Sequence, residues 1–300
     1  VDKNKKFDKE KIMKYLVIGD ANSMHIYNFT KNFLIPKGYE IHLLTLATQP
    51  VREEYRRFYK KNKIILHSVA EKNYKGLDKT DRLHRMINLI RKLKLMKDVP
   101  KVDICHLQSV YKTSVMMILH NKRKYKKLVL SYWGGDLEVC SKKILKFMEK
   151  ALNRADSITV TVKKVLDDFR SIYGNKYDDK VSICRFATAG IEYINRISKT
   201  LTREECRQSY NIPHNKICIT CGYSAYREQH QELCLKKIGE LPKRIKDNIY
   251  CIVPMQYGRM NDTDYINAVK QEQERADFDC IILKDFVPFE MSAKLAIATD

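Results

Sequence analysis

The chain is short of glycine, proline and tryptophan: its 300 residues include ten glycines, seven prolines and one tryptophan. It holds no short internal repeat and no low-complexity linker, which excludes a repeat architecture. It also lacks any run near the roughly 18 to 20 apolar residues of a membrane-spanning helix, and its first residues, "VDKNKKFDKEK", lack the apolar core of a signal peptide. We therefore expect neither export nor a membrane span, and we expect a cytoplasmic protein.

The nine cysteines lie mostly at apolar positions. An odd number of cysteines in a chain without an export signal is typical of reduced cytosolic thiols. The one CxxC, "CITC" from Cys218 to Cys221, lies in an apolar run of strand type, where its two side chains would point to opposite faces. We expect a strand at this position and not a metal or redox site.

Positive charge is concentrated in one part of the chain. The formal net charge is +21; residues 1–200 carry 43 Lys and Arg against 21 Asp and Glu, whereas residues 201–300 carry 14 against 15. The segment "HNKRKYKK" (120–127) contributes to this excess. Such an asymmetry favours a polyanion or an anionic surface as a partner of the first part alone.

Apolar runs of strand length alternate with segments of helical periodicity, which is the pattern of a parallel sheet with crossover helices. The order restarts near residue 200, where Thr202 and Glu205 have capping-box spacing. The predicted strands are 15–19, 40–46, 63–69, 102–108, 127–133, 157–162, 180–186, 216–222, 248–255 and 280–286. We expect an α/β fold of two domains, 13–200 and 201–300, after an N-terminal extension at 1–12. The second domain has only three predicted strands, so we expect it to be incomplete at residue 300.

The segment "VIGDANSMH" (17–25) follows the first predicted strand and begins a helix. Backbone N–H groups and the helix dipole at such a turn suit an anion or another polar ligand at the carboxyl end of a sheet. The turn lacks GxGxxG, which argues against a dinucleotide. His25 would lie in the first turn of the helix, with a structural role and a functional role equally open.

The segment "LSYWGGDL" (130–137) occupies an equivalent place after an inner strand. Two adjacent glycines let the backbone turn sharply or approach a ligand, and Asp136 would follow as a hydrogen-bond acceptor or a base. A tight turn with Asp136 as a helix N-cap explains the pattern equally well. Trp133 fits either core packing or stacking on a sugar.

The segment "CGYSAYREQHQE" (221–232) is the matching turn of the second domain. A glycine and small residues, followed by Arg227 and His230 at a helix start, would form a site for phosphate oxygens. A solvated surface charge is the competing explanation of Arg227. We favour the phosphate role.

Two further segments have a structural and a functional interpretation. Residues 79–98 place Leu83, Met86, Ile87, Ile90 and Leu93 on one helical face bordered by Arg and Lys. Packing of this face on the sheet is the commoner outcome, and contact with anionic lipid headgroups is the alternative. "DTD" at 262–264 has the spacing of a metal-binding motif, but it opens a helix, so we expect capping.

Taken in order, these segments resemble those of a known family, the GT-B glycosyltransferases. The likeness is to the retaining enzymes of glycosyltransferase family four and its relatives that build bacterial surface polysaccharides, including the aminosugar transferases of enterobacterial common antigen type. It covers about residues 13–300. It rests on "GDANSMH", "YWGGDL", "RADSITVTVKKVLDDFRSIYG" with "KVSICRFATAGIEYI", "CGYSAYREQHQ" and "LKDFVPFEMSAKLAIATD".

The resemblance implies two Rossmann-like domains facing a cleft, the first binding the acceptor and the second the nucleotide-sugar donor. It implies no metal and no cofactor, because Arg, Lys and helix dipoles neutralise the leaving nucleoside diphosphate. His25 and Asp136 are the implied catalytic residues. The implied acceptor-binding residues are Gly19, Asp20, Trp133, Gly134 and Gly135, and the implied donor-binding residues are Gly222, Tyr223, Ser224, Arg227 and His230.

The donor turn departs from the family pattern. The common motif has an Arg directly after the glycine and a Lys soon after it, whereas here Tyr223 follows Gly222 and Arg227 comes later. The acidic motif that usually binds the donor ribose would lie beyond Asp300. We therefore expect this chain to bind the donor poorly.

The resemblance implies a metal-independent glycosyltransferase of cell-surface polysaccharide synthesis, retaining in stereochemistry, with a nucleotide-diphosphate sugar as donor and a saccharide, often lipid-linked, as acceptor. The basic first domain would then bind the anionic inner face of the membrane. One alternative is a nucleotide-sugar epimerase of the same architecture. Another is a basic nucleic-acid-binding protein, which the dispersed charge and the lack of a zinc, aromatic or helix-turn-helix signature disfavour; we expect no nucleic-acid partner.

Overall fold

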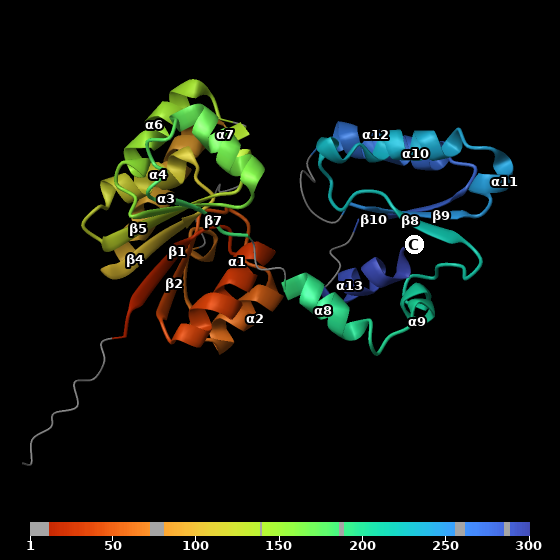
Figure 1. Cartoon of the computed structure of the whole chain (residues 1–300), viewed down its shortest axis with the longest axis horizontal. Coiled ribbons are helices and arrows are strands. Elements are labelled where there is room, and N and C mark those ends of the chain that lie inside the picture. The colour runs from red at the N-terminus through yellow and green to blue at the C-terminus, as the bar shows by residue number, and fades with distance from the viewer. Residues whose placement is uncertain (1–11, 73–80, 139, 186–188, 256–261, 285–288) are drawn as a thin grey trace, which may run out of the picture. The chain divides into compact units, whose positions relative to one another are not determined.

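The computed structural model describes residues 12–72, 81–138, 140–185, 189–255, 262–284 and 289–300 (Figure 1). The chain divides into two compact units, Val1–Ala187 and Thr188–Asp300. This division lies before the boundary predicted at residue 200, since α8 (Ala189–Ile197) packs against α13 (Phe289–Ala298) of the second unit.

The first unit is built on a seven-stranded sheet with the order β3-β2-β1-β4-β5-β6-β7, in which every neighbouring pair is parallel. The strands are β1 Lys14–Ile18, β2 Glu40–Thr45, β3 Ile65–Ser68, β4 Val102–Gln108, β5 Tyr125–Tyr132, β6 Ser157–Val160 and β7 Val181–Ile183. The seven strands predicted for this unit are confirmed. The strand order reverses between β1 and β4, which is where open parallel sheets bind their ligands.

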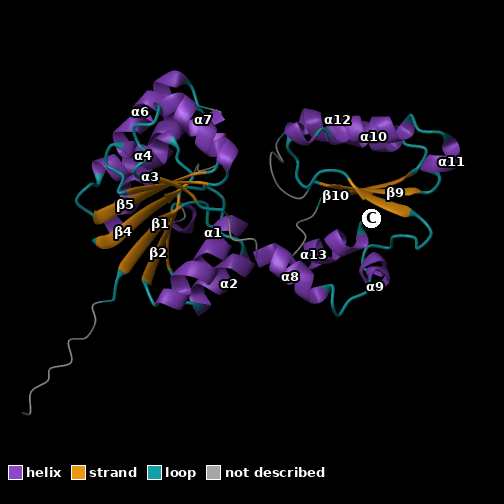
Figure 2. Ribbon diagram, viewed as in Figure 1, coloured by secondary structure: helices purple, strands orange, loops and turns teal. Residues whose placement is uncertain are grey.

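Helices cover both faces of this sheet (Figures 1 and 2). The helices are α1 Met24–Phe29, α2 Glu53–Lys61, α3 Arg82–Asp98, α4 Lys112–His120, α5 Gly135–Glu138, α6 Lys142–Leu152 and α7 Lys163–Tyr173. α1 and α2 pack on a cluster that includes Val17 and Leu43, and the opposite cluster includes Leu16 and Leu107. Near-continuous apolar strands are buried on both faces, as expected for a parallel sheet.

α3 contradicts the expected packing of its most apolar face. Leu83, Met86 and Ile90 are 59%, 58% and 47% exposed. The buried side chains of this helix lie on the opposite face, which carries Leu95 and Met96. The predicted inward face is therefore outward at Leu83, Met86 and Ile90, whereas Leu93 of the same face packs against the core.

A chain of polar side chains crosses one face of the first sheet. The Tyr15 hydroxyl lies 2.9 Å from Nδ1 of His106, whose Nε2 lies 2.6 Å from Oγ of Ser131, and this oxygen lies 2.6 Å from Oγ1 of Thr159. The four residues belong to β1, β4, β5 and β6. Burial lowers the pKa of His106 to about 3, so its ring is neutral at pH 7.

The second unit has a three-stranded parallel sheet with the order β10-β9-β8. Its elements are β8 Ile217–Thr220, β9 Ile249–Pro254, β10 Asp279–Leu283, α8, α9 Arg203–Gln208, α10 Gln231–Gly239, α11 Lys243–Lys246, α12 Thr263–Arg275 and α13. α10 and α12 cover one face, and α9 and α13 cover the other (Figure 1). The capping box of Thr202 and Glu205 is confirmed at the start of α9.

The two cysteines of "CITC" lie in different core clusters of the second unit. Cys218 packs with the residues of α9 and α13, and Cys221 packs with those of α10 and α12. Side chains three positions apart along an extended chain point to opposite faces. The prediction of a strand at this CxxC is confirmed.

Candidate functional site

The turn after β1 lies at the point where the strand order of the first sheet reverses. Gly19 donates its N–H to the Leu44 carbonyl at 3.1 Å, and a Cβ at this position would lie 2.6 Å from Cδ1 of Ile26. Only glycine therefore lets α1 pack this closely on the end of β1. Asp20 is exposed and accepts a hydrogen bond from the N–H of Asn22 at 2.9 Å.

His25 and Trp133 lie against each other although they come from different turns. His25 is the second residue of α1, where Ser23 caps the helix by accepting the His25 N–H. The His25 ring meets the half-buried Trp133 indole edge-on, with 5.3 Å between ring centroids. Partial burial lowers the pKa of His25, so the ring is neutral at pH 7.

Asp136 is fully buried and holds two turns together. One carboxylate oxygen accepts the Val110 N–H at 2.9 Å, and the other accepts the N–H groups of Trp133 and Gly134, each at 3.0 Å. Burial raises the pKa of Asp136, and these backbone N–H groups oppose the rise by stabilising the carboxylate. Such a carboxylate connects the turns after β4 and β5 as a hydrogen-bond acceptor, one of the roles expected from the sequence, and it lies inside α5 and not at an N-cap position before the helix.

The two adjacent glycines of this turn have different structural roles. Gly134 has φ +108°, which disfavours any other residue. Gly135 begins α5 with a regular backbone, and a Cβ there would meet open space. The prediction of a sharp turn is confirmed by Gly134, and Gly135 leaves room in front of the turn.

Two residues at the end of β4 were missed by the sequence analysis. Ser109 adopts φ +71°, and its hydroxyl donates to Asp136 at 3.3 Å. Gln108 is buried beside it and lies 3.3 Å from Nε2 of His106. Strained non-glycine backbone is concentrated at functional sites. The polar pair that directly follows the apolar strand was the available signal.

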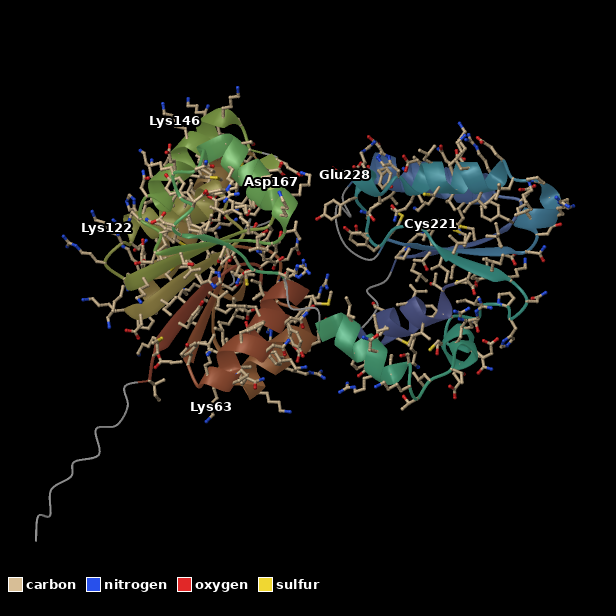
Figure 3. The ribbon with its side chains drawn as sticks, viewed as in Figure 1. Lys63, Lys122, Lys146, Asp167, Cys221 and Glu228 are labelled. Atoms are coloured by element: carbon tan, nitrogen blue, oxygen red, sulfur yellow. The ribbon has the colours of Figure 1, made fainter. Side chains whose placement is uncertain are left out.

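In the second unit, the turn between β8 and α10 is shaped by Gly222 and Gln231. Gly222 has φ +69°, and a Cβ there would lie 2.9 Å from Nε2 of Gln231. Gln231 is fully buried and donates from this nitrogen to the carbonyls of Ser224 (3.0 Å) and Pro254 (3.1 Å). The helix that follows this turn, α10, begins at Gln231, after a short 3-10 turn over Arg227–Gln229. Cys221 and Glu228, at the start and in the middle of this turn, are labelled in Figure 3.

Arg227 is held by the N-terminal end of α12. Its Nε and Nη2 donate to the two carboxylate oxygens of Asp262 at 2.8 and 2.9 Å, and its guanidinium lies 5.6 Å from the centre of the Tyr265 ring. The Asp262 carboxylate raises the pKa of Arg227 above its usual value. Asp262 also caps α12 through the Tyr265 N–H, which confirms the capping role predicted for "DTD".

The remaining residues of this turn differ in exposure. Tyr223 is 61% exposed, and His230 has a left-handed backbone (φ +51°) with its ring outward. Ser224 is fully buried, and its hydroxyl oxygen has no hydrogen-bond partner among the described residues. The turn thus presents the N-terminus of α10 and one guanidinium, a combination that suits a phosphate group.

Within the described ranges, no group of three or more His, Cys, Asp or Glu side chains is arranged to hold a metal ion.

Comparison with known proteins identifies the first unit. The sequence model of a family described as "Glycosyl transferase 4-like" matches residues 14–162. These residues run from β1 to just past β6 and include His25, Trp133 and Asp136. No curated protein sequence matches the chain significantly.

Solved structures match nearly the whole chain at low identity. A sucrose-phosphate synthase from Thermosynechococcus elongatus has a TM-score of 0.69 at 12% identity, covering 96% of this chain and 74% of its own. A glycosyltransferase from Rickettsia africae has a TM-score of 0.62 at 14% identity, covering 97% and 72%. A UDP-GlcNAc 2-epimerase from Neisseria meningitidis, bound to UDP-GlcNAc, has a TM-score of 0.56 at 13% identity, covering 96% and 76%. These likenesses establish the fold of the GT-B glycosyltransferases, and residues 14–162 match their glycosyl transferase 4-like family.

Proposed function

We propose that the chain transfers a sugar from a nucleotide-diphosphate sugar to a saccharide acceptor, with retention of configuration and without a metal. The observation that carries this proposal is the combination, in one chain, of a glycosyl transferase 4-like unit and a second parallel-sheet unit whose first strand ends in a phosphate-type turn. The UDP-GlcNAc bound to the epimerase of similar fold supports a nucleotide sugar as the donor.

In this proposal the second unit binds the donor diphosphate. The backbone around Gly222 and Tyr223 and the Arg227 guanidinium contact phosphate oxygens, with His230 beside them, and the buried Ser224 supports the turn. Arg227 has bound Asp262 through Nε and Nη2, which leaves Nη1 to donate to a phosphate. Charge developing on the leaving diphosphate is stabilised by this guanidinium and by the N-terminus of α10.

The first unit binds the acceptor. His25, neutral and packed against Trp133, accepts a hydrogen bond or a proton from an acceptor hydroxyl. The exposed Asp20 and the backbone at Gly19, Gly134 and Gly135 line the same sheet edge. Asp136 acts through the turns that it anchors and is therefore a positioning residue. We further propose a lipid-linked saccharide of cell-surface polysaccharide synthesis as the acceptor, used at the cytoplasmic face of the membrane.

The deciding experiment incubates the chain with a panel of nucleotide sugars, with and without saccharide and lipid-linked acceptors. Release of nucleoside diphosphate together with a glycosylated acceptor supports transfer, and NMR of the product reports its anomeric configuration. An isomerised donor without acceptor use would favour an epimerase instead. Salt-dependent binding of DNA or RNA with neither reaction would favour a nucleic-acid-binding protein. Transfer that persists in EDTA supports the metal-independent mechanism, and its loss would contradict it.

A further inference from the structure

The outer face of α3 combines apolar and basic side chains in separate zones. Leu83, Met86 and Ile90 follow one another at helical spacing and are all about half exposed or more. Lys94 and Lys97 continue the same face toward the end of the helix and are exposed. We call these five residues the α3 face.

A second basic segment lies at the C-terminal end of the α3 face. The Lys124 ammonium donates to the carbonyl oxygens of Lys97 (3.1 Å) and Val99 (2.6 Å), which fixes the turn after α4 against the end of α3. In this turn Lys122 and Arg123 are exposed, and Figure 3 shows Lys122 projecting outward. The fold therefore joins two basic segments that are separate in the sequence.

The placement of charge and apolar area has a physical interpretation. A helix that lies in a membrane interface inserts its apolar side chains below the headgroups, while Lys and Arg bind lipid phosphates. Residues 1–200 carry 43 Lys and Arg against 21 Asp and Glu, an excess of 22 positive charges. None of the helices in the described part of the chain has the length and apolar character needed to cross a bilayer.

We propose that the α3 face, with the turn containing Lys122 and Arg123, is the surface by which the chain docks on an anionic lipid bilayer. Charge complementarity selects this partner. A bilayer also accepts a convex single helix without a matching groove, whereas three apolar side chains fall well short of the roughly 800 Å² per partner that a stable protein interface buries. This inference rests on the proposed function, because it places the membrane contact of that function on a defined surface. Lipid is the one partner that it names.

Co-sedimentation of the full chain with vesicles tests the surface. The vesicles are phosphatidylcholine with and without phosphatidylglycerol, at low salt, with neither donor nor acceptor present. Leu83→Ser with Ile90→Ser removes apolar contact, and Lys94→Glu with Lys97→Glu reverses charge. All four positions are exposed, so these variants keep the fold. The matched control is Lys142→Glu with Lys146→Glu on α6, which makes the same change of charge at exposed positions of the same unit.

We expect the unaltered chain to bind the anionic vesicles and not the neutral ones. The charge variant should bind about 25-fold more weakly or worse, at about fivefold per lysine. The serine variant should lose a large share of binding, and the α6 control should bind nearly as well as the unaltered chain. Equal loss of binding in the α6 control would show that net charge alone drives binding, which would overturn the proposal. The proposal would also be overturned if the unaltered chain did not bind anionic vesicles. A concentration-dependent dimer that the serine variant abolishes would overturn it as well.

Transfer to a soluble acceptor separates this proposal from the proposed function. The α3 face shares no residue with the candidate site, so both α3 variants should transfer sugar to a soluble acceptor at the rate of the unaltered chain. Vesicle binding without any transfer would leave the docking surface intact and refute the transferase. Transfer without vesicle binding would support the transferase and refute the docking surface.

Discussion

The buried Asp136 carboxylate connects the ends of two neighbouring strands at the candidate acceptor site. Its oxygens accept N–H groups from Val110 on one side and from Trp133 and Gly134 on the other. Charge-assisted bonds to a buried carboxylate are stronger than neutral ones. The position of Trp133, and through it the environment of His25, therefore depends on this residue.

Asp136→Asn should destabilise the chain while preserving its fold. The amide keeps one oxygen but presents an NH₂ group to backbone N–H donors, which costs about 1–3 kcal/mol for the donors left unpaired. Urea unfolding measures this loss, and the transfer rate should fall with it. Asp167→Asn is the control, since it removes only an exposed pair with Lys163 and should cost about 0.5 kcal/mol or less. Equal stability of Asp136→Asn and the unaltered chain would contradict the anchoring role.

His25→Ala should lower the transfer rate about 100-fold or more with little change in stability, because His25 is exposed. The pKa of His25 lies below its usual value of 6.5, so the ring stays unprotonated at pH 7 and the rate should fall only as the pH drops below about 6.5. Steady-state kinetics across pH measures both effects. His120→Ala, at an exposed position on α4, should change neither. A rate that already falls above pH 7 on acidification would rule out His25 as the titrating group.

At the scale of elements, the hydrogen-bonded side chains from Tyr15 to Thr159 connect four strands of the first sheet through the neutral ring of His106. The folded pKa of His106 is about 3, against 6.5 for the free side chain. Between these two values the unfolded chain binds a proton that the folded chain does not. The stability that this site contributes is therefore lost as the pH falls below 6.5.

The free energy of unfolding should fall on acidification from pH 6.5 by up to about 1.4 kcal/mol per pH unit from His106. Burial also lowers the pKa of His67, to about 4, which acts in the same direction. His106→Gln should reduce the slope, as chemical denaturation at several pH values would show. His120→Gln should leave the slope unchanged. A slope that does not differ between the two variants would refute this assignment.

The turn after β8 and the N-terminal end of α12 form one structural element, because Asp262 holds Arg227. Arg227→Ala should raise the KM for the donor about 10- to 100-fold, as expected for the loss of a hydrogen bond to a charged group. Arg227→Lys should restore part of the lost donor affinity, since an ammonium supplies the charge without the planar geometry. Kinetics with varied donor concentration measures the change. Arg275→Ala, which removes an exposed pair with Glu272, is the control, and an equal effect of both alanine variants would argue against a donor contact.

At the scale of the whole molecule, the sequence predicts the sheets well. Near-continuous apolar runs are typical of strands buried on both faces, and all ten predicted strands are present. The turns that follow β1, β5 and β8 were likewise found as glycines and polar residues after apolar runs. These features are local, so the sequence alone carries them.

Contacts between distant segments were not predicted. Arg227 and Asp262 are 35 positions apart, and the sequence around either residue does not indicate a contact with the other. α3 has apolar residues on two faces, since both Leu83 and Leu95 belong to stripes of helical spacing, and only packing on the sheet decides which face is buried. The burial of Asp136 has the same origin, because Val110, in the turn after β4, donates to it from a distant segment of the sequence.

The close contact of Gly222 with Gln231 has an evolutionary consequence. A Cβ at residue 222 would overlap the Gln231 amide that holds the carbonyls of Ser224 and Pro254. A substitution at position 222 is opposed both by this overlap and by the left-handed backbone there (φ +69°). A smaller residue at 231 by itself leaves two buried carbonyls without a donor. Each single change destabilises the turn, so we expect selection to keep both residues.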